Sequence, residues 1–186
     1  MPSPDLPRPG LRTNVVGVTG SGKTTTAGRL AEILDIPHVE LDALHWGPGW
    51  VGADKDVFRA RVAAALAGEA WVVDGNYRAV RAVVWPRVDT VVWLDYPLPV
   101  ILAQLFRRSV RRIRTQEVLW GTNRESWRTQ FASRDSLFVW AIQTHRRRKR
   151  EIPEVLARPE HARIAVIHHR SPAATRAWLD RLAADP

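Results

Sequence analysis

One motif constrains this chain more than any other feature, and it spans Gly17-Val-Thr-Gly-Ser-Gly22-Lys23-Thr24. It matches the pattern G-x-x-x-x-G-K-[ST] and lies between an apolar strand pattern and a helical one, which is the context that this motif needs. Glycines let the backbone turn its N–H groups toward phosphate oxygens, and the N-terminus of the following helix adds partial positive charge. We therefore predict a nucleotide-binding loop formed by Gly17, Thr19, Gly20, Ser21, Gly22, Lys23, Thr24 and Thr25.

The polar residues of this motif have separate expected tasks. Lys23 is expected to reach the β- and γ-phosphates of a nucleoside triphosphate, and the Thr24 hydroxyl is expected to bind Mg²⁺. A chance match in a chain of this length has a probability on the order of one in a hundred or lower, before its context is counted. The sequence thus predicts ATP and Mg²⁺ as cofactors, against the alternative of a glycine-rich turn with an exposed lysine.

Apolar strand patterns alternate with helical patterns along the chain. The strands are expected at residues 13–18, 38–42, 70–75, 90–97 and 163–169. The helices are expected at residues 27–34, 58–66, from 98 into an arginine-rich stretch, from 137 into a basic run, and from 171 to the end. This alternation predicts βαβ units and an α/β fold whose parallel sheet is covered by helices on both faces.

Composition places limits on the remaining possibilities. The 186 residues suit a single domain over residues 13–183, preceded by a proline-rich stretch, residues 1–12, that we expect to be a disordered tail. The chain has no Cys, which excludes disulfides and thiolate chemistry and favours the cytoplasm. No apolar run approaches the roughly 18 to 20 residues of a membrane span, so we expect no membrane partner.

The net charge of +9 is concentrated in one segment. Residues 101–150 hold 13 Lys and Arg but only three acids, whereas the rest of the chain is close to neutral. Such a segment is typical of proteins that bind polyanions, either a nucleotide triphosphate or a nucleic acid. Its position along the fold therefore decides between these partners.

Three aspartates, Asp42, Asp74 and Asp95, lie at the carboxyl ends of predicted strands. Ligands of an open parallel sheet bind beyond the carboxyl ends of its strands. Asp74 follows an apolar strand, as a Walker B residue does, and is expected to bind Mg²⁺ together with Thr24. Asp42 is expected to orient or deprotonate an acceptor hydroxyl, or to bind a donor group. Turn chemistry is the alternative for each of the three, and for Asp95 a capping or turn role is favoured.

The stretch Asp74-Gly-Asn-Tyr-Arg78 resembles the Asp-Gly-Phe-Pro-Arg element of adenylate kinases and related nucleoside monophosphate kinases. Together with Leu41-Asp-Ala-Leu-His-Trp46 and Pro48-Gly-Trp50, it is similar to the adenylate-kinase-like proteins labelled topology-modulation proteins, or FlaR-like. The resemblance covers about residues 13–182. It implies a P-loop NTPase three-layer sandwich, a five-stranded parallel sheet in the order 2-3-1-4-5 and a helical, arginine-rich lid.

The resemblance also implies a function, the Mg²⁺- and ATP-dependent transfer of a γ-phosphoryl group to a nucleotide or another small acceptor. The lid is expected over about residues 107–135, with Arg107 and Arg111 as catalytic residues beside Lys23 and Asp42. Supporting lid arginines are Arg112, Arg128 and Arg134. The acceptor-side insertion at about residues 43–69 is short, which favours a compact acceptor held by Asp42, Trp46, Arg59 and Arg78.

The basic run at residues 146–150 supports an alternative function. Cations are stabilised at a helix C-terminus, so the run has a structural explanation, but five cations can also contact nucleic acid phosphates. An ATP-binding regulatory protein that contacts nucleic acid therefore remains a second hypothesis, with salt-dependent binding as its signature. A P-loop ATPase that uses water as its acceptor is a third, and it would release phosphate without an added acceptor.

Overall fold

The computed structural model describes residues 8–126 and 136–184. Its centre is a five-stranded sheet in the order β2-β3-β1-β4-β5, and all four strand pairs are parallel, which confirms the expected topology. The strands are β1 (Arg12–Gly17), β2 (His38–Glu40), β3 (Trp71–Asp74), β4 (Thr90–Leu94) and β5 (Ala165–His169). Because the sheet is parallel, the carboxyl ends of all five strands lie at one edge, where the motif residues gather.

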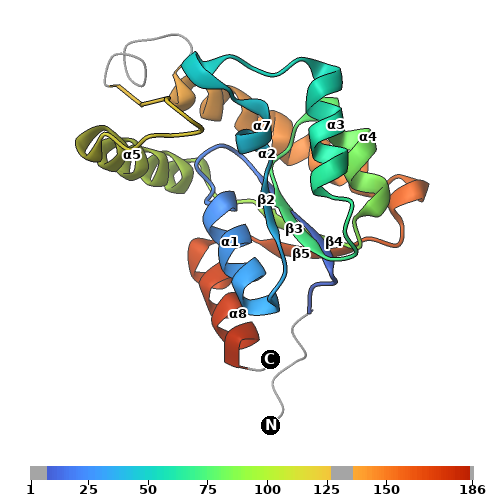
Figure 1. The fold of residues 1–186 in the computed structure, drawn as a ribbon. Helices are drawn as coiled ribbons and strands as arrows, with labels where there is room; N and C mark the ends of the chain where they lie inside the picture. Colours follow the sequence, from blue (N-terminus) through green and yellow to red (C-terminus); the bar gives the residue numbers. More distant parts are fainter. Residues whose placement is uncertain (1–7, 127–135, 185–186) are drawn as a thin grey trace.

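Helices follow the strands in the alternation that the sequence predicts (Figure 1). The α-helices are α1 (Lys23–Leu34), α2 (Leu41–His45), α3 (Lys55–Ala65), α4 (Arg81–Val84), α5 (Leu98–Thr115), α7 (Leu137–Leu156) and α8 (Pro172–Ala184). Short 3₁₀ helices are η1 (Pro48–Trp50), η2 (Arg78–Val80), η3 (Trp85–Arg87) and η4 (Pro159–His161). In the described part of the chain, no helix has both the length and the apolar character needed to cross a bilayer.

Two apolar cores lie on opposite faces of the sheet. Successive residues of a strand point to opposite faces, so Val15 enters one core and Val16 enters the other. The first core contains buried residues of α1, α5 and α8, and the second contains those of α3, α4 and the C-terminal half of α7. Figure 1 shows α1 and α8 on one side of the sheet and α3 and α4 on the other. This is the expected three-layer sandwich.

The structure corrects the second predicted strand. β2 ends at Glu40, and Asp42 lies in the first turn of α2, where its carbonyl oxygen accepts a hydrogen bond from the Trp46 N–H at 2.9 Å. A carboxylate in the first turn of a helix is stabilised by the partial positive charge of the exposed N–H groups. The sequence did not reveal that a helix begins at Leu41, because a strand and a helix both place Asp42 at the same edge of the sheet.

The N-terminal boundary also differs from the expectation. Arg12, which we assigned to the tail, is the first residue of β1, and its N–H donates to Asp89 Oδ2 at 2.9 Å. Gly10 is also held, because its N–H donates to Thr90 Oγ1 at 2.8 Å. Residues 1–7 lie outside the described part of the chain. The folded domain therefore begins a few residues before the predicted boundary.

Candidate active site

The phosphate loop connects β1 to α1 and packs against α5. Gly20 and Gly22 have φ angles of 85° and 86°, a left-handed conformation that favours glycine. A Cβ atom on Gly20 would lie 3.1 Å from both the Ile101 carbonyl oxygen and Leu105 Cβ, so α5 approaches the loop closely. Gly22 is the N-cap of α1 and has no side chain to bond the first N–H groups of the helix, which leaves them available to a bound phosphate.

Lys23 begins α1 and bends back over the loop, where its Nζ donates to the Val18 carbonyl oxygen at 3.1 Å. Burial lowers the pKa of Lys23, while the charges of Asp42 and Asp74 raise it and those of Arg108 and Arg148 lower it. Two carboxylates and two guanidinium groups therefore lie within electrostatic reach of the ammonium group. The three cations together can neutralise a triphosphate at this position.

Asp74 has the environment expected of a magnesium ligand, and Thr24, in the first turn of α1, stays the second predicted ligand. Asp74 is the last residue of β3 and is 3% exposed, and its Oδ1 accepts no hydrogen bond from the described residues. The His38 Nε2 lies 3.5 Å from this oxygen. Within the described ranges no three His, Cys, Asp or Glu side chains form a metal site by themselves. Mg²⁺ needs no such set, because phosphate oxygens and waters supply most of its ligands.

Asp42 is held by an aromatic hydrogen-bond relay. The Tyr77 hydroxyl donates to Asp42 Oδ1, and a side-chain hydrogen bond links Trp46 to the same hydroxyl. Burial, followed by the charge of Asp42, raises the pKa of Tyr77, so this hydroxyl keeps its proton and donates it to the carboxylate. The His45 ring contacts Trp46 and Tyr77 at centroid distances of 4.7 Å and 4.9 Å. The carboxylate of Asp42 thus has a fixed orientation at the sheet edge.

The segment that follows α5 folds back onto the acceptor side. Asn123, which is 2% exposed, accepts a hydrogen bond from the Trp50 N–H at 2.8 Å and donates one to the Gly47 carbonyl oxygen at 2.9 Å. The Trp120 ring lies 5.6 Å from that of Trp50, which in turn lies 6.0 Å from Trp46. Two segments that are distant in the sequence therefore form one aromatic wall, which we call the tryptophan wall.

The arginines predicted to bind the acceptor, Arg59 and Arg78, contact protein groups. Arg59 Nε donates to the Ala79 carbonyl oxygen at 2.9 Å, and its Nη1 lies 3.1 Å from Asp56 Oδ1. Arg78 Nε donates to Glu151 Oε1 at 2.9 Å. The structure does place Asp42 and Trp46 together, whereas Arg59 and Arg78 lie exposed and have partners of their own.

Glu151 is the centre of a three-arginine cluster. Its two carboxylate oxygens accept hydrogen bonds from Arg78, Arg81 and Arg148 at 2.9, 2.9 and 3.1 Å. Burial alone would raise the pKa of Glu151, but these hydrogen bonds and charges outweigh it and lower the pKa from 4.5 to about 2. Because Arg148 also donates to the Asn76 carbonyl oxygen at 3.0 Å, the cluster ties α7 to the loop after β3.

Replacing Glu151 with Gln is expected to destabilise the protein in a pH-dependent way. A carboxylate whose folded pKa is lowered stabilises the fold above its unfolded pKa, and this contribution disappears as pH falls from about 4.5 toward 2. We expect a loss of about 2 kcal/mol in the free energy of unfolding at pH 7, and a smaller loss at pH 3. Urea denaturation at both pH values measures it, and Glu154→Gln, on an exposed position of α7, is the control. A loss that does not depend on pH would contradict the ionic origin.

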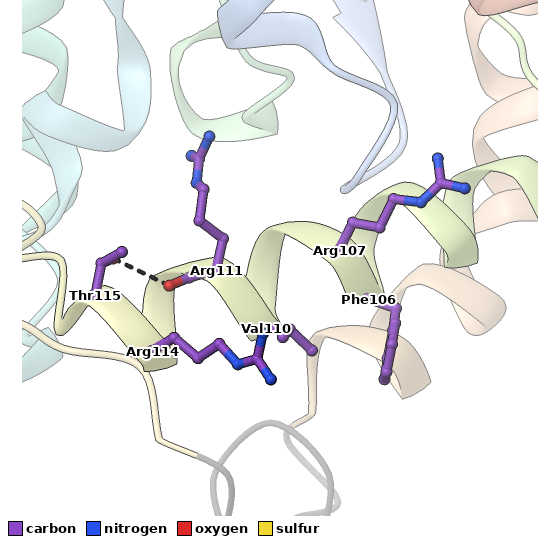
Figure 2. Close-up of a pocket in the computed structure, with 6 residues that line it drawn as sticks. All are labelled: Phe106, Arg107, Val110, Arg111, Arg114 and Thr115. Carbon is purple, nitrogen blue, oxygen red and sulfur yellow. Dashed lines mark hydrogen bonds between the residues drawn. The ribbon is translucent and has the colours of Figure 1, made fainter.

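The arginines of α5 differ in burial. Arg107 and Arg111 are exposed, and Figure 2 shows them leaving the helix on the side opposite Phe106. Arg108 is half-buried, with its pKa lowered by burial and by Arg112, and it is within electrostatic reach of Asp42. Leu105 contacts the phosphate loop, and residue 108 follows it by three positions, so it lies on nearly the same face of the helix.

The lid expected over residues 107–135 is thus described only in part. Its first portion is the C-terminal half of α5, and Arg112 Nη1 there donates to the buried Glu125 Oε1 at 3.0 Å. Arg128 and Arg134 lie outside the described residues. The described portion connects α5 to Asn123 through Glu125, and hence to the acceptor side.

Three cations of the basic run contact the protein itself. Arg148 joins the Glu151 cluster, Lys149 Nζ lies 3.8 Å from Asp95 Oδ2, and the Arg147 guanidinium lies over the Trp140 ring at 5.7 Å. Asp95 also pairs with His168 Nε2 at 3.1 Å. These contacts give the basic run a structural role, and they weaken the hypothesis that it binds nucleic acid.

Comparisons with known proteins agree with the architecture. No protein-family model matches the sequence, and no curated protein matches it. Among solved structures, a shikimate kinase from Bacteroides thetaiotaomicron aligns over 94% of this chain and 97% of its own, with 16% identity and a TM-score of 0.52. A gluconokinase from Sinorhizobium meliloti 1021 aligns over 93% of both chains, with 20% identity and a TM-score of 0.48. The chain has the fold of P-loop kinases.

Sequence reasoning missed several residues at this site. Glu40 directly precedes α2 and pairs in register with Asp74, which the alternation of strand residues could have indicated. Arg108 follows the apolar positions of α5 at helical spacing, so its inward position was also readable from periodicity. Trp120 and Asn123 carried no local signal, because their partners lie about 70 residues earlier in the chain.

Proposed function

We propose that this protein is a Mg²⁺- and ATP-dependent phosphotransferase that moves the γ-phosphoryl group to a hydroxyl of a small acceptor. The main support is the convergence of a phosphate loop, a buried carboxylate at the end of β3 and a second, hydrogen-bonded carboxylate. Lys23 is within electrostatic reach of both carboxylates, Asp42 and Asp74. This arrangement matches what phosphoryl transfer requires, namely positioning together with charge neutralisation.

Each residue of the site has a separate proposed role in phosphoryl transfer. The loop N–H groups and Lys23 bind the β- and γ-phosphates, and Thr24 and Asp74 would hold Mg²⁺, which neutralises phosphate charge when bound. The acceptor oxygen forms a bond to the γ-phosphorus, the bond from that phosphorus to the β–γ bridging oxygen breaks, and ADP leaves. Asp42 accepts the proton of the acceptor hydroxyl while Tyr77 keeps the carboxylate oriented.

The lid arginine in this proposal is Arg108, in place of Arg107 and Arg111. Its half-buried position near Lys23 and Asp42 suits a group that neutralises charge developing on the transferred phosphoryl. Arg148 is the second candidate, because it is also within electrostatic reach of Lys23. Arg107 and Arg111, whose side chains are exposed, are better placed to contact solvent or an incoming nucleotide.

We assign the protein to the adenylate-kinase-like P-loop kinases on its motifs, but we propose an acceptor other than a nucleoside monophosphate. Binding of an acceptor phosphate requires available cations, and Arg59 and Arg78 are already paired with Asp56 and Glu151. The short segment of residues 43–69 adds α3 and η1 and no larger acceptor domain. A small hydroxylated acceptor next to Asp42 fits this site better.

Measurement of ADP release against a panel of acceptors tests the proposed function. The panel should contain nucleoside monophosphates, nucleosides, sugars, sugar acids and amino alcohols, each with and without Mg²⁺. We expect at least one acceptor class to raise Mg²⁺-dependent ADP release about tenfold or more above the rate without acceptor. Phosphate release that no acceptor stimulates would indicate an ATPase, and no ATP turnover across the panel would exclude the phosphotransferase.

A further inference from the structure

We propose that one water molecule is bound inside the fold, between β1 and the loop that follows β3, as a fixed part of the structure. Its partners are Asn14 Oδ1, Asn76 Nδ2 and Arg81 Nε. The site is independent of the proposed function, because it concerns the support of a loop and not the reaction. Three observations support it: a cavity of suitable size, buried polar atoms on its wall, and donors and acceptors in the combination that water needs.

The cavity lies between the central strand of the sheet and the loop after β3. Asn14, Asn76 and Arg81 line it together with Tyr77 and buried apolar side chains of the second core. The Tyr77 hydroxyl is already bonded to Asp42, so the other three side chains supply the free polar groups. About 10 Å³ is open to the centre of a water molecule, so the cavity has room for one water and for little more.

Asn14 supplies the acceptor. It lies in β1, the central strand, and is 2% exposed. Its side chain points to the same face of the sheet as that of Val16, which enters the second core. The Oδ1 atom of Asn14 is buried and accepts no hydrogen bond from the described residues. A buried amide oxygen without a partner is unfavourable, and native proteins satisfy such atoms with protein groups or internal water.

Asn76 and Arg81 supply two donors, because Asn76 Nδ2 and Arg81 Nε are buried and donate to no described residue. Arg81 Nη2 donates to Asn76 Oδ1 at 3.4 Å and to Glu151 Oε1 at 2.9 Å. These bonds occupy the oxygen of Asn76 and fix the guanidinium group. The Gly75 N–H donates to the Val15 carbonyl oxygen at 3.3 Å, which holds the loop against β1 beside Asn14.

One water molecule matches this set of atoms. It would accept hydrogen bonds from Asn76 Nδ2 and Arg81 Nε and donate one to Asn14 Oδ1, and about three such bonds are usual for a buried water. A cation would lie against the charged guanidinium of Arg81, and an anion would lie against the Asn14 oxygen, so both are disfavoured. The geometry therefore selects a small neutral molecule that both donates and accepts.

The water would join two parts of the candidate active site. β1 leads directly into the phosphate loop. The loop after β3 carries Tyr77, which donates to Asp42, and the Asn76 carbonyl oxygen, which accepts from Arg148 at 3.0 Å. Through one molecule, the strand before the phosphate loop thus supports the loop that holds Asp42 and Arg148.

A crystal structure of the full chain, at a resolution that shows ordered water, tests the site directly. We expect density for one water at about 2.7 to 3.2 Å from each of the three named atoms. Magnetic relaxation dispersion of water oxygen counts long-lived internal waters in solution and provides a second measurement. No density in the cavity would overturn the proposal, and so would an anomalous peak there after a bromide soak, because it would identify an anion.

Variants of Asn14 connect the water to the named atoms. Asn14→Leu replaces the acceptor with an apolar group of similar size, so the number of long-lived waters should fall by one. Asn14→Asp keeps an oxygen at this position and should keep the water. Ser109→Ala is the control, because the Ser109 hydroxyl is also buried without a described partner but does not line this cavity. An unchanged count in Asn14→Leu, or an equal loss in Ser109→Ala, would contradict the assignment. If Asn14→Leu does not fold, the crystal structure of the parent protein decides alone.

Discussion

Replacement of Lys23 with Ala is expected to lower acceptor-dependent ADP release by about a thousandfold or more. Lys23 is the cation of the phosphate-loop motif and the first residue of α1, and it also lies within electrostatic reach of both candidate carboxylates, Asp42 and Asp74. Its removal takes away charge neutralisation at the β- and γ-phosphates and leaves two carboxylates near the triphosphate. The loss should fall on kcat more than on the KM for the acceptor, because the acceptor contacts remain.

Folding should not account for this loss. The Lys23 side chain makes one described hydrogen bond, to the Val18 carbonyl oxygen, and its burial is unfavourable for a charge. The thermal midpoint of the Lys23→Ala protein should therefore equal or exceed that of the parent protein. Lys55→Ala, at the exposed first residue of α3, is the matched control and should keep full activity. Activity within tenfold of the parent in Lys23→Ala would contradict the role of the loop.

The second large effect distinguishes two neighbouring arginines of α5. Arg108→Ala should reduce kcat by about 100- to 1,000-fold, because a half-buried guanidinium near Lys23 and Asp42 is lost from the transfer site. Arg107→Ala should change kcat by less than about threefold, because that side chain is exposed, whereas Arg108 is half-buried. Steady-state kinetics with saturating ATP and acceptor measure both.

This pair of variants is a stringent control because the two positions share a helix, a residue type and a net charge. A larger loss of kcat in Arg107→Ala than in Arg108→Ala would assign the lid function to Arg107, as the sequence predicted. An equal loss in both would indicate that α5 acts through its total charge. Arg108→Lys tests geometry further, since lysine keeps the charge but not the planar fork of five donors.

The sequence predicted the architecture because the determining signals are local. Neighbours within a few positions determine the phosphate loop, the alternating strands and the acidic residue that ends β3. The resemblance supplied the strand order. Asp74 was placed correctly because an apolar strand leads directly to it. The helical start of α2 was missed, since the pattern around Asp42 is compatible with either conformation.

Other features depend on contacts that no local pattern encodes. Phe106 of α5 is apolar and exposed, so the helix has no clean division between apolar and charged faces, and the choice between Arg107 and Arg108 was ambiguous. Glu151 is buried because three arginines from separate segments meet there. Asn123 binds residues that precede it by more than 70 positions. Only the tertiary structure brings such partners together.

The contacts of Asn123 have a thermodynamic consequence for how nucleotide binding and acceptor binding affect each other. Arg112 joins α5 to Glu125, and Asn123 joins the same segment to the backbone at Gly47 and Trp50, so the helix that carries Arg108 is linked to the tryptophan wall. We expect a movement of the wall toward an acceptor to shift Arg108 as well. Because such coupling is reciprocal, a bound nucleotide should then raise the affinity for the acceptor by the same factor as the acceptor raises that for the nucleotide. The proposed phosphotransferase would thereby be least reactive toward water when its acceptor is missing.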